Sequence, residues 1–497
     1  MNDYNDYKEY SVKIYDVSMA ISVLSWDQET KMPKNGAKFR AQQLSTLAKI
    51  RFELFTDKKY GELLEKLFND SSLNFDEKRN ITLSRKDYLK QKKYTSEFIG
   101  RESKLISTAF NDWRIAKDKN DFKLFKSSLE KLVELRKEEC ELLAYKNHPY
   151  DALLDAYEPN LTTKDVDLIF DDVKNKLVPF INKICKANNV DDSFFYQHFD
   201  HKKQWDFGVD LLKQMGYDFD SGRQDISPHP FSSHFSPEDA RVTTRIDEKN
   251  LSEMIWSCIH EGGHALYEQG ILSENYGTPL GNAISLGIHE SQSRLWENHI
   301  GRSFPYWKNN FSLLKSYFPE QLNNINYKSF YHACNNVKPS LIRTNADELT
   351  YHLHVLIRYE IEKGLIEGSI SVSDLPLIWN EKYEKYLRIK VPNDSMGVLQ
   401  DIHWSHGSFG YFPTYTLGSF YAAQFYNQAS IEISNINSKI ENGNTKELLE
   451  WLRKNIHHHG ERYDAKDLCI KITGEELNFK YFMDYAKSKY SKIYNIN

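Results

Sequence analysis

The chain has 497 residues, a net charge of −5 and a pI near 6.4, with 40% hydrophobic and 27% charged residues. This length exceeds the usual size of one hydrophobic core, so we expect two domains or one large bipartite body. The mild negative charge disfavours nucleic acid or an anionic membrane surface as the main partner.

The cysteines and the start of the chain indicate a cytoplasmic protein. The five cysteines are scattered and form no CxxC pair, which favours a reducing compartment. The opening MNDYNDYKEYSVKIYD is polar and lacks the basic and apolar regions of a secretory signal. No apolar run approaches the length that crosses a bilayer.

Helical periodicity dominates the chain, and we expect its apolar stripes to lie in the core. The first clear stripe consists of Phe39, Leu44, Leu47, Ile50 and Leu54. The segments that show the pattern are residues 34–55, 121–146, 163–186 and 345–366. Residues 225–246 differ, because they are rich in Ser, Pro and Thr and predict loops and short strands. These strands would flank the helix that follows.

That helix contains the sequence CIHEGGHALYE, residues 258–268. His260 and His264 are four residues apart, so on a helix both imidazoles project from one face. They suit two corners of a zinc tetrahedron, and Glu261 beside them is placed to take a proton from bound water. The adjacent glycines Gly262 and Gly263 cost helix propensity, which predicts that another backbone approaches there. That backbone is the 239–245 segment or a peptide substrate, and Gly263 is predicted to be the tighter position.

A catalytic zinc site needs a third protein ligand and an open position for water or substrate. The extended pattern HExxHxxGxxH is absent. Glu290 is favoured because it begins a second helical stretch after a turn containing Gly and Pro, so a second helix can cross the first. The candidates are Glu268, Glu274, Glu290 and Glu297. Zinc and cobalt both suit two imidazoles and a carboxylate.

Eight collinear motifs resemble the thermostable metallocarboxypeptidases of peptidase family M32. They span most of the chain. The motifs are WDQETKMP (26–33), HPF (229–231), DARVT (239–243), HEGGH (260–264), HESQ (289–292), IRTNADE (342–348), GVLQDIHW (397–404) and GYFPTYTLG (410–418).

The resemblance implies a mainly α fold of the neurolysin-like gluzincin type, with a deep active-site groove and a small β-sheet. It implies a single peptidase domain over residues 1–497. Helices of about 1–200 would form one wall, and about 201–497 would carry the metal. The ligands would be His260, His264 and Glu290, with Glu261 as catalytic acid/base. Family members are commonly homodimers that remove C-terminal residues from peptides.

The last two motifs supply candidates for stabilising the oxyanion, which needs preorganised donors. They are His403, Tyr411 and Tyr415. A carboxypeptidase must also bind a free carboxylate, and Arg suits that by bidentate pairing. Arg343 is favoured over Arg241, although either could instead pair with a neighbouring Asp347 or Asp239.

Three other observations complete the predictions. His229 and His289 are expected to orient ligands or to be structural, and the run His457–His459 is expected to be a solvated turn. An endo-acting metallo-oligopeptidase of the same fold is the alternative function. A zinc-stabilised binding protein without catalysis is a third reading, which Glu261 disfavours because a structural site has no use for it.

Overall fold

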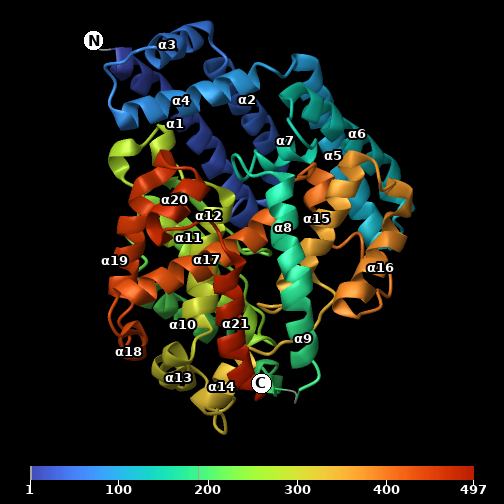
Figure 1. The fold of residues 1–497 in the computed structure, drawn as a ribbon, viewed down its shortest axis with the longest axis vertical. Coiled ribbons are helices and arrows are strands. Elements are labelled where there is room, and N and C mark those ends of the chain that lie inside the picture. The colour runs from blue at the N-terminus through green and yellow to red at the C-terminus, as the bar shows by residue number, and fades with distance from the viewer. Residues whose placement is uncertain (1–2, 188–189, 497) are drawn as a thin grey trace. The chain divides into compact units, whose positions relative to one another are not determined.

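The computed structural model describes residues 3–187 and 190–496 as a mainly helical protein with one three-stranded sheet (Figure 1). This confirms the predicted mainly α fold class with a small sheet. Within these residues no helix is both long enough and apolar enough to cross a membrane.

The chain forms two compact units, each assembled from three segments. Unit 1 comprises Met1–Lys92, Asp191–Cys334 and Ala422–Glu476, and unit 2 comprises Lys93–Val190, Asn335–Tyr421 and Leu477–Asn497. The first helices of the chain therefore belong to the same unit as the HEGGH segment. The expected single peptidase domain, with its walls divided near residue 200, stays a prediction.

Unit 1 is organised around α11 (Leu251–Glu268), against which α10, α12 and β3 pack. The element is buried over most of its length, because its apolar residues face neighbours on several sides. The other helices are α1 (Asp3–Thr30), α2 (Ala37–Phe55), α3 (Lys58–Phe68), α4 (Phe75–Gln91), α10 (His201–Met215), α12 (Leu286–Arg294), α13 (Phe304–Tyr317), α14 (Tyr327–Cys334), α18 (Ile436–Glu441), α19 (Lys446–Asn455) and α20 (Ala465–Thr473).

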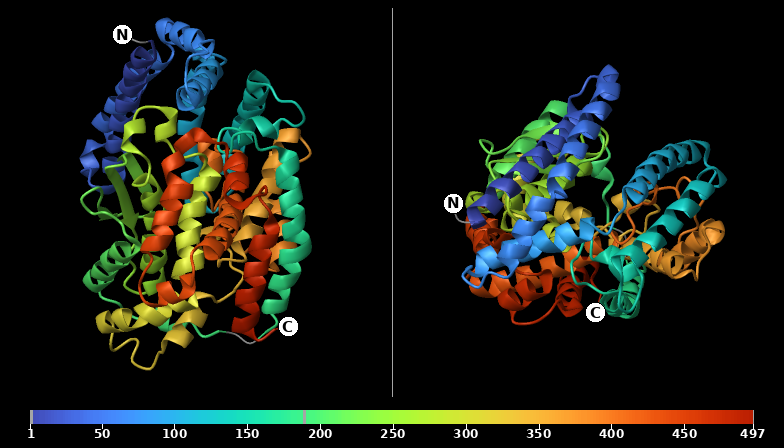
Figure 2. Two further views of the ribbon diagram at one scale, coloured as in Figure 1. Left: turned by 60° about the vertical axis from the view of Figure 1, so that its left-hand side comes forward. Right: turned by 90° about the horizontal axis from the view of Figure 1, so that it is seen from above.

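The sheet of unit 1 has the order β1-β3-β2, with β1 (Gln224–Ile226) parallel and β2 (Ser232–Ser236) antiparallel to β3 (Asp239–Thr244). Both β2 and β3 contact α11, and β2 also contacts α1, as the green arrows of Figure 2 show. The expected strands in 225–246, and their place beside the HEGGH helix, are confirmed.

Unit 2 contains a core of helices around α15 (Tyr351–Glu367), which α6, α7 and α16 contact. The boundary between the units falls within α17 (Pro413–Glu432). The other helices of unit 2 are α5 (Ser96–Lys119), α6 (Lys123–Leu143), α7 (Tyr150–Leu154), α8 (Thr163–Asp172), α9 (Val178–Ile184), α16 (Leu375–Leu387) and α21 (Phe479–Tyr494).

The predicted helices form, but their ends and burial differ in two places. In α2 the expected core stripe is wrong, because Phe39 is 66% exposed and Ile50 is 41% exposed. The spacing correctly predicted a helix. This helix packs chiefly on α1 alone, so much of its apolar stripe has no second element to cover it. The helix expected from residue 345 begins at Tyr351, because the Asp347 carboxylate accepts from the N–H groups of Leu349 and Thr350.

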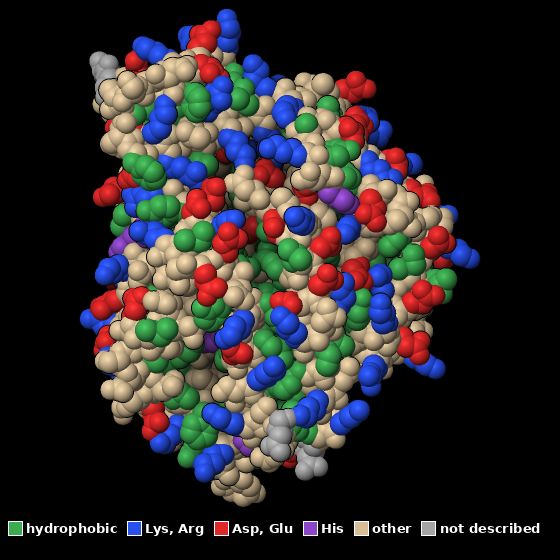
Figure 3. All heavy atoms as spheres, viewed as in Figure 1, with side chains coloured by type: hydrophobic (Ala, Val, Ile, Leu, Met, Phe, Trp, Pro, Cys, Tyr) green, Lys and Arg blue, Asp and Glu red, His purple; other side chains and the backbone are tan. Residues whose placement is uncertain are grey.

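On the described residues of the face in Figure 3, Lys and Arg side chains are interspersed with Asp and Glu. That face therefore presents alternating charge and not an extended field of one sign. Such a pattern is typical of an ordinary solvated surface.

Candidate active site

The two histidines of HEGGH lie one turn apart on α11. Asn250 caps the start of the helix, because its side chain accepts from the N–H of Ser252. The imidazole centroids of His260 and His264 are 5.0 Å apart. Both rings therefore lie on one face of the helix, as the spacing predicted.

Glu290 reaches both histidines from α12, a helix capped by the Ser285 hydroxyl. Its Oε2 lies 3.7 Å from Nε2 of His260 and 3.4 Å from Nε2 of His264. Two atoms bound tetrahedrally to one zinc ion are about 3.3–3.6 Å apart, given metal–ligand bonds of about 2.0–2.2 Å. The three side chains therefore fit a divalent metal ion.

Among residues 3–187 and 190–496, these three form the one group of three or more His, Cys, Asp and Glu side chains whose ligand atoms all lie within 4.8 Å of one another. Burial would raise the pKa of Glu290, but the Arg294 guanidinium and the two imidazoles bring it well below its usual range. Arg294 Nε donates to Glu290 Oε1 at 2.6 Å. The carboxylate is thus held ionised, as a metal ligand must be.

The glycine pair allows two helices to approach α11. A Cβ on Gly263 would lie 2.7 Å from Cα of Ser293 and 2.8 Å from the carbonyl oxygen of Gln292, both backbone atoms of α12. A Cβ on Gly262 would meet the side chain of Leu212 on α10 at 2.7 Å. The expectation that the 239–245 segment or the substrate needs this space is wrong, whereas the tighter position of Gly263 is confirmed.

The other acidic candidates have different partners. Glu297 Oε2 lies 2.9 Å from Nδ1 of His260, on the side of the ring away from Glu290. Glu268 Oε1 contacts Nε2 of His289 at 2.8 Å. Glu274 is exposed in the short helix Ser273–Asn275.

Glu261 is buried, and it lies on α11 between the predicted ligands His260 and His264. Burial raises the pKa of its carboxyl to about 7, with Glu290 also raising it, while His260 and a hydrogen bond from Ser232 lower it. A carboxyl with a pKa near neutrality can both accept and deliver a proton. A bound cation would lower this pKa, because positive charge favours the ionised form.

A second cluster of predicted residues forms within unit 2. His403 opens the short helix His403–His406, and its Nε2 lies 3.3 Å from the hydroxyl of Tyr415 at the start of α17. The ring of Tyr411 is centred 5.2 Å from that of Tyr415. Burial, and then the Arg343 guanidinium, lower the pKa of His403 to about 3. The imidazole is therefore neutral at physiological pH.

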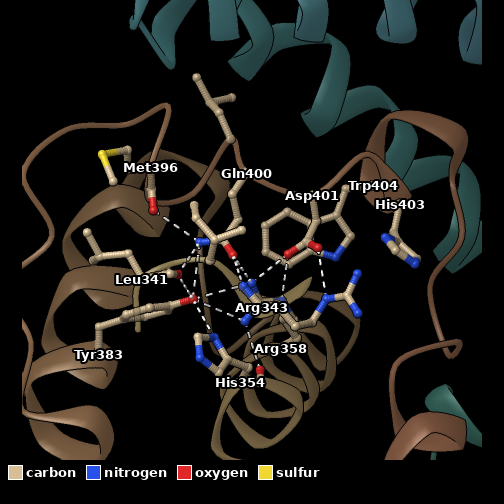
Figure 4. A network of polar contacts seen from close by, with 12 residues as sticks. Leu341, Arg343, His354, Arg358, Tyr383, Met396, Gln400, Asp401, His403 and Trp404 are labelled. Carbon is tan, nitrogen blue, oxygen red and sulfur yellow. Dashed lines mark hydrogen bonds and ion pairs between the residues drawn. The ribbon is translucent and has the colours of Figure 1, made fainter. Parts of the chain in front are cut away.

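Arg343 belongs to the same cluster, where Asp401 orients it (Figure 4). Its Nε donates to Asp401 Oδ1 at 2.9 Å, and its Nη1 donates to the Tyr351 hydroxyl at 2.9 Å. Arg358 Nε donates to the other oxygen of Asp401 at 2.7 Å. Asp401, not Asp347, is thus the partner of Arg343. The sequence reading missed it, although it lies two residues before His403 in GVLQDIHW.

Arg241 pairs along its own strand, as the structural alternative proposed. Its Nε and Nη2 donate to the two oxygens of Asp239 at 2.7 and 2.8 Å. The guanidinium also stacks over Trp26 of the first motif, 4.6 Å from the ring centre. Two donors of this guanidinium are therefore already paired, as are two donors of Arg343.

The histidines outside the triad lie in different environments. His289 stacks on His264 with centroids 4.3 Å apart, whereas His229 is exposed. The solvated turn expected at residues 457–459 is wrong for His457. That imidazole is fully buried, and its Nε2 lies 3.0 Å from Oε1 of Gln292 on α12.

A zinc-type triad on two crossing helices, with a buried carboxyl beside it, defines a metallopeptidase of the HExxH class. Residues 6–490 match the family model described as Carboxypeptidase Taq (M32) metallopeptidase. The chain belongs to this family and is a metallocarboxypeptidase.

Similar proteins cover the chain almost completely. Carboxypeptidase 1 of Bacillus subtilis is 40% identical over 97% of both chains. An M32 carboxypeptidase from Deinococcus radiodurans has a TM-score of 0.98 at 35% identity over 100% of both chains. A structure described as that of CHT has a TM-score of 0.97 at 53% identity over 99% of both.

Proposed function

We propose that this protein is an exo-acting carboxypeptidase that binds Zn²⁺ at His260, His264 and Glu290 and uses Glu261 as general acid/base. The observation that carries the proposal is the position of Glu261, a buried carboxyl with a pKa near 7, directly beside the triad. Two imidazoles and a carboxylate also suit Co²⁺.

A metal ion held by His260, His264 and Glu290 would supply the Lewis acidity that polarises a water molecule and the scissile carbonyl. Glu261 takes a proton from the attacking water and later gives it to the leaving amine. Burial keeps the pKa of the Glu261 carboxyl high enough for both transfers. Glu297 fixes the ring of His260 from the opposite nitrogen.

We propose roles in the reaction for residues of the unit 2 cluster, on the strength of the motifs GVLQDIHW and GYFPTYTLG. His403, Tyr415 and Tyr411 would donate hydrogen bonds to the developing oxyanion. Arg343 would bind the terminal carboxylate, with Nε and Nη1 already committed to Asp401 and Tyr351. Arg241 is the alternative ligand of that carboxylate.

These two arginines can be told apart by substrate binding. Arg343→Gln should raise KM for a peptide with a free C-terminus and should leave the amount of bound metal unchanged. Arg241→Gln should change neither. The reverse pattern would assign the carboxylate to Arg241.

The exo mode is tested by digesting one peptide with a free C-terminus beside its C-terminally amidated twin. The proposal expects sequential loss of single residues from the free peptide, none from the amidated one, and no products after chelation. Equal internal cleavage of both peptides would instead support the endo-acting oligopeptidase. We further propose that the protein acts as a homodimer, which light scattering at working concentration checks.

A further inference from the structure

A buried carboxylate in unit 2 has no role in the chemistry above. Glu362 lies on α15 and is completely inaccessible to solvent. Its Oε2 accepts from the Tyr150 hydroxyl at 2.6 Å and from the N–H of Gly410 at 2.9 Å. Its Oε1 accepts from the indole Nε1 of Trp404 at 2.8 Å. A buried carboxylate without such donors would be strongly unfavourable.

Two of the three donors bracket one segment of the chain. Trp404 directly follows His403, and Gly410 directly precedes Tyr411. Glu362 therefore ties both ends of residues 404–410 to the middle of α15. The segment cannot shift without breaking a hydrogen bond to a buried carboxyl, which would leave a buried polar group without that partner.

Arg136 on α6 holds the middle of the same segment. Its Nε donates to the carbonyl oxygen of Gly407 at 2.8 Å, and its Nη2 donates to Glu102 at 2.6 Å. Gly407 and Gly410 have φ values of +70° and +90°, which favour glycine. A Cβ on Gly410 would lie 2.7 Å from the backbone of Leu153. The path of the segment is thus fixed from three sides.

His403 depends on this path together with the rings beside it, of which the Phe412 ring is centred 4.4 Å from the imidazole. Its buried Nδ1 has no hydrogen-bond partner among the described residues, and its Nε2 contacts Tyr415 at 3.3 Å. The position of the imidazole therefore depends in part on the backbone that leads into Trp404, which Figure 4 shows beside it. A displacement of that backbone would therefore displace the imidazole of His403.

We propose that Glu362 is a positioning residue that, with Arg136, holds His403 and Tyr411 in place for transition-state stabilisation. The inference rests on the proposed function of those two side chains. Glu362 touches no substrate and acts through Trp404 and Gly410. Its loss should therefore lower kcat and leave substrate binding and the metal site of unit 1 unchanged.

Glutamine is a demanding test of this role, because it keeps the volume but replaces one oxygen with an NH2 group. In one orientation the NH2 group of the glutamine faces the Trp404 N–H, and in the other orientation it faces the Gly410 N–H. Each arrangement sets donor against donor. Trp404→Phe removes one of these donors, so it should relieve part of the conflict that Glu362→Gln creates.

The experiment compares kcat, KM, bound metal and melting temperature for wild type, Glu362→Gln, Trp404→Phe and the double variant. Glu360→Gln is the matched control, because Glu360 lies on the same helix and accepts from Tyr386 instead. We expect Glu362→Gln to lower kcat roughly ten- to a hundredfold, with KM within about twofold and full metal content. The double variant should lose less than the two single losses multiplied together.

Each contrary outcome has a distinct meaning. Unchanged kcat in Glu362→Gln overturns the inference, as does a loss that only follows the folded fraction and shows no coupling to Trp404. If Glu362→Gln does not fold, Trp404→Phe carries the test, and its unchanged kcat overturns the inference. A wild-type protein that binds zinc but removes no C-terminal residue contradicts the proposed function instead.

Discussion

His260 Nδ1 and Glu297 Oε2 are 2.9 Å apart, and this contact leaves the other ring nitrogen of His260 facing Glu290. Glu297 is itself held by Arg302, whose Nη2 donates to Oε1 at 3.0 Å. A carboxylate behind a ligand histidine fixes its tautomer and strengthens its basicity. The pair therefore connects the metal site to the short π-helix Leu295–Gly301.

Glu297→Gln should weaken zinc affinity about 10- to 100-fold, because the amide orients His260 less well and adds no negative charge. Competition with a fluorescent chelator measures the affinity. Glu274→Gln is the control, since that exposed carboxylate lies outside the triad. Equal zinc affinity in wild type and Glu297→Gln would show that the contact does not support the ligand.

Acid should release the metal through His260 before the other ligands. Burial lowers the pKa of His260, but Glu290 and Glu297 raise it to a net value above the ordinary 6.5. Burial lowers the pKa of His264 to about 3, and Glu290 also stays ionised to low pH. Protons therefore compete at His260 first, and zinc affinity should fall as pH drops through and below neutrality.

This order is checked by measuring the zinc dissociation constant against pH in wild type and Glu297→Gln, and by comparing the pH at which each constant begins to rise. Because Glu297 helps to raise the pKa of His260, its removal should move the onset of proton competition to lower pH. The same onset in both proteins would show that His260 is not the first site to be protonated.

The sequence predicted the ligand pair and Glu261 because a four-residue spacing on a helix determines which side chains share a face. It predicted the strands at 225–246 from composition. It could not predict which backbone the glycines admit, because that depends on the crossing of α11 and α12. Nor could it identify Asp401 or Glu362, since their partners come from segments distant in the chain. The signal for Glu362 was a charged residue within the helical stretch 345–366, and the signal for Asp401 was its place two residues before His403.

Gly263→Ala should destabilise unit 1 by about 1–3 kcal/mol, because its Cβ would meet the backbone of α12, which cannot rotate away. Gly262→Ala should be much closer to neutral, because the flexible ends of Leu212 and Met215 can shift and Ala gains about 1 kcal/mol of helix propensity. Urea denaturation of both variants gives the comparison. Equal losses at the two positions would contradict this account of the pair.

Glu362 should make stability fall as pH rises. Burial raises the pKa of its carboxyl from 4.5 to about 7, so between these values the folded protein binds a proton that the unfolded chain releases. By linkage, folding loses stability with increasing pH in this window, by roughly 3 kcal/mol in total. Denaturation of chelated wild type and Glu362→Gln at pH 5 and pH 8 tests this. Burial also raises the pKa of Glu261 to about 7 and that of Glu461 to about 8, so these groups add the same trend in both proteins. An equal pH dependence in wild type and Glu362→Gln would contradict the contribution of Glu362.

The measurement that tests the central claim most directly is turnover per bound zinc in Glu261→Gln. The substitution keeps the size of the side chain beside His260 but cannot transfer the proton. We predict wild-type zinc content by elemental analysis and a loss of kcat of at least about 100-fold. A variant that holds zinc and releases C-terminal residues at a near-normal rate would contradict the role of Glu261 as acid/base.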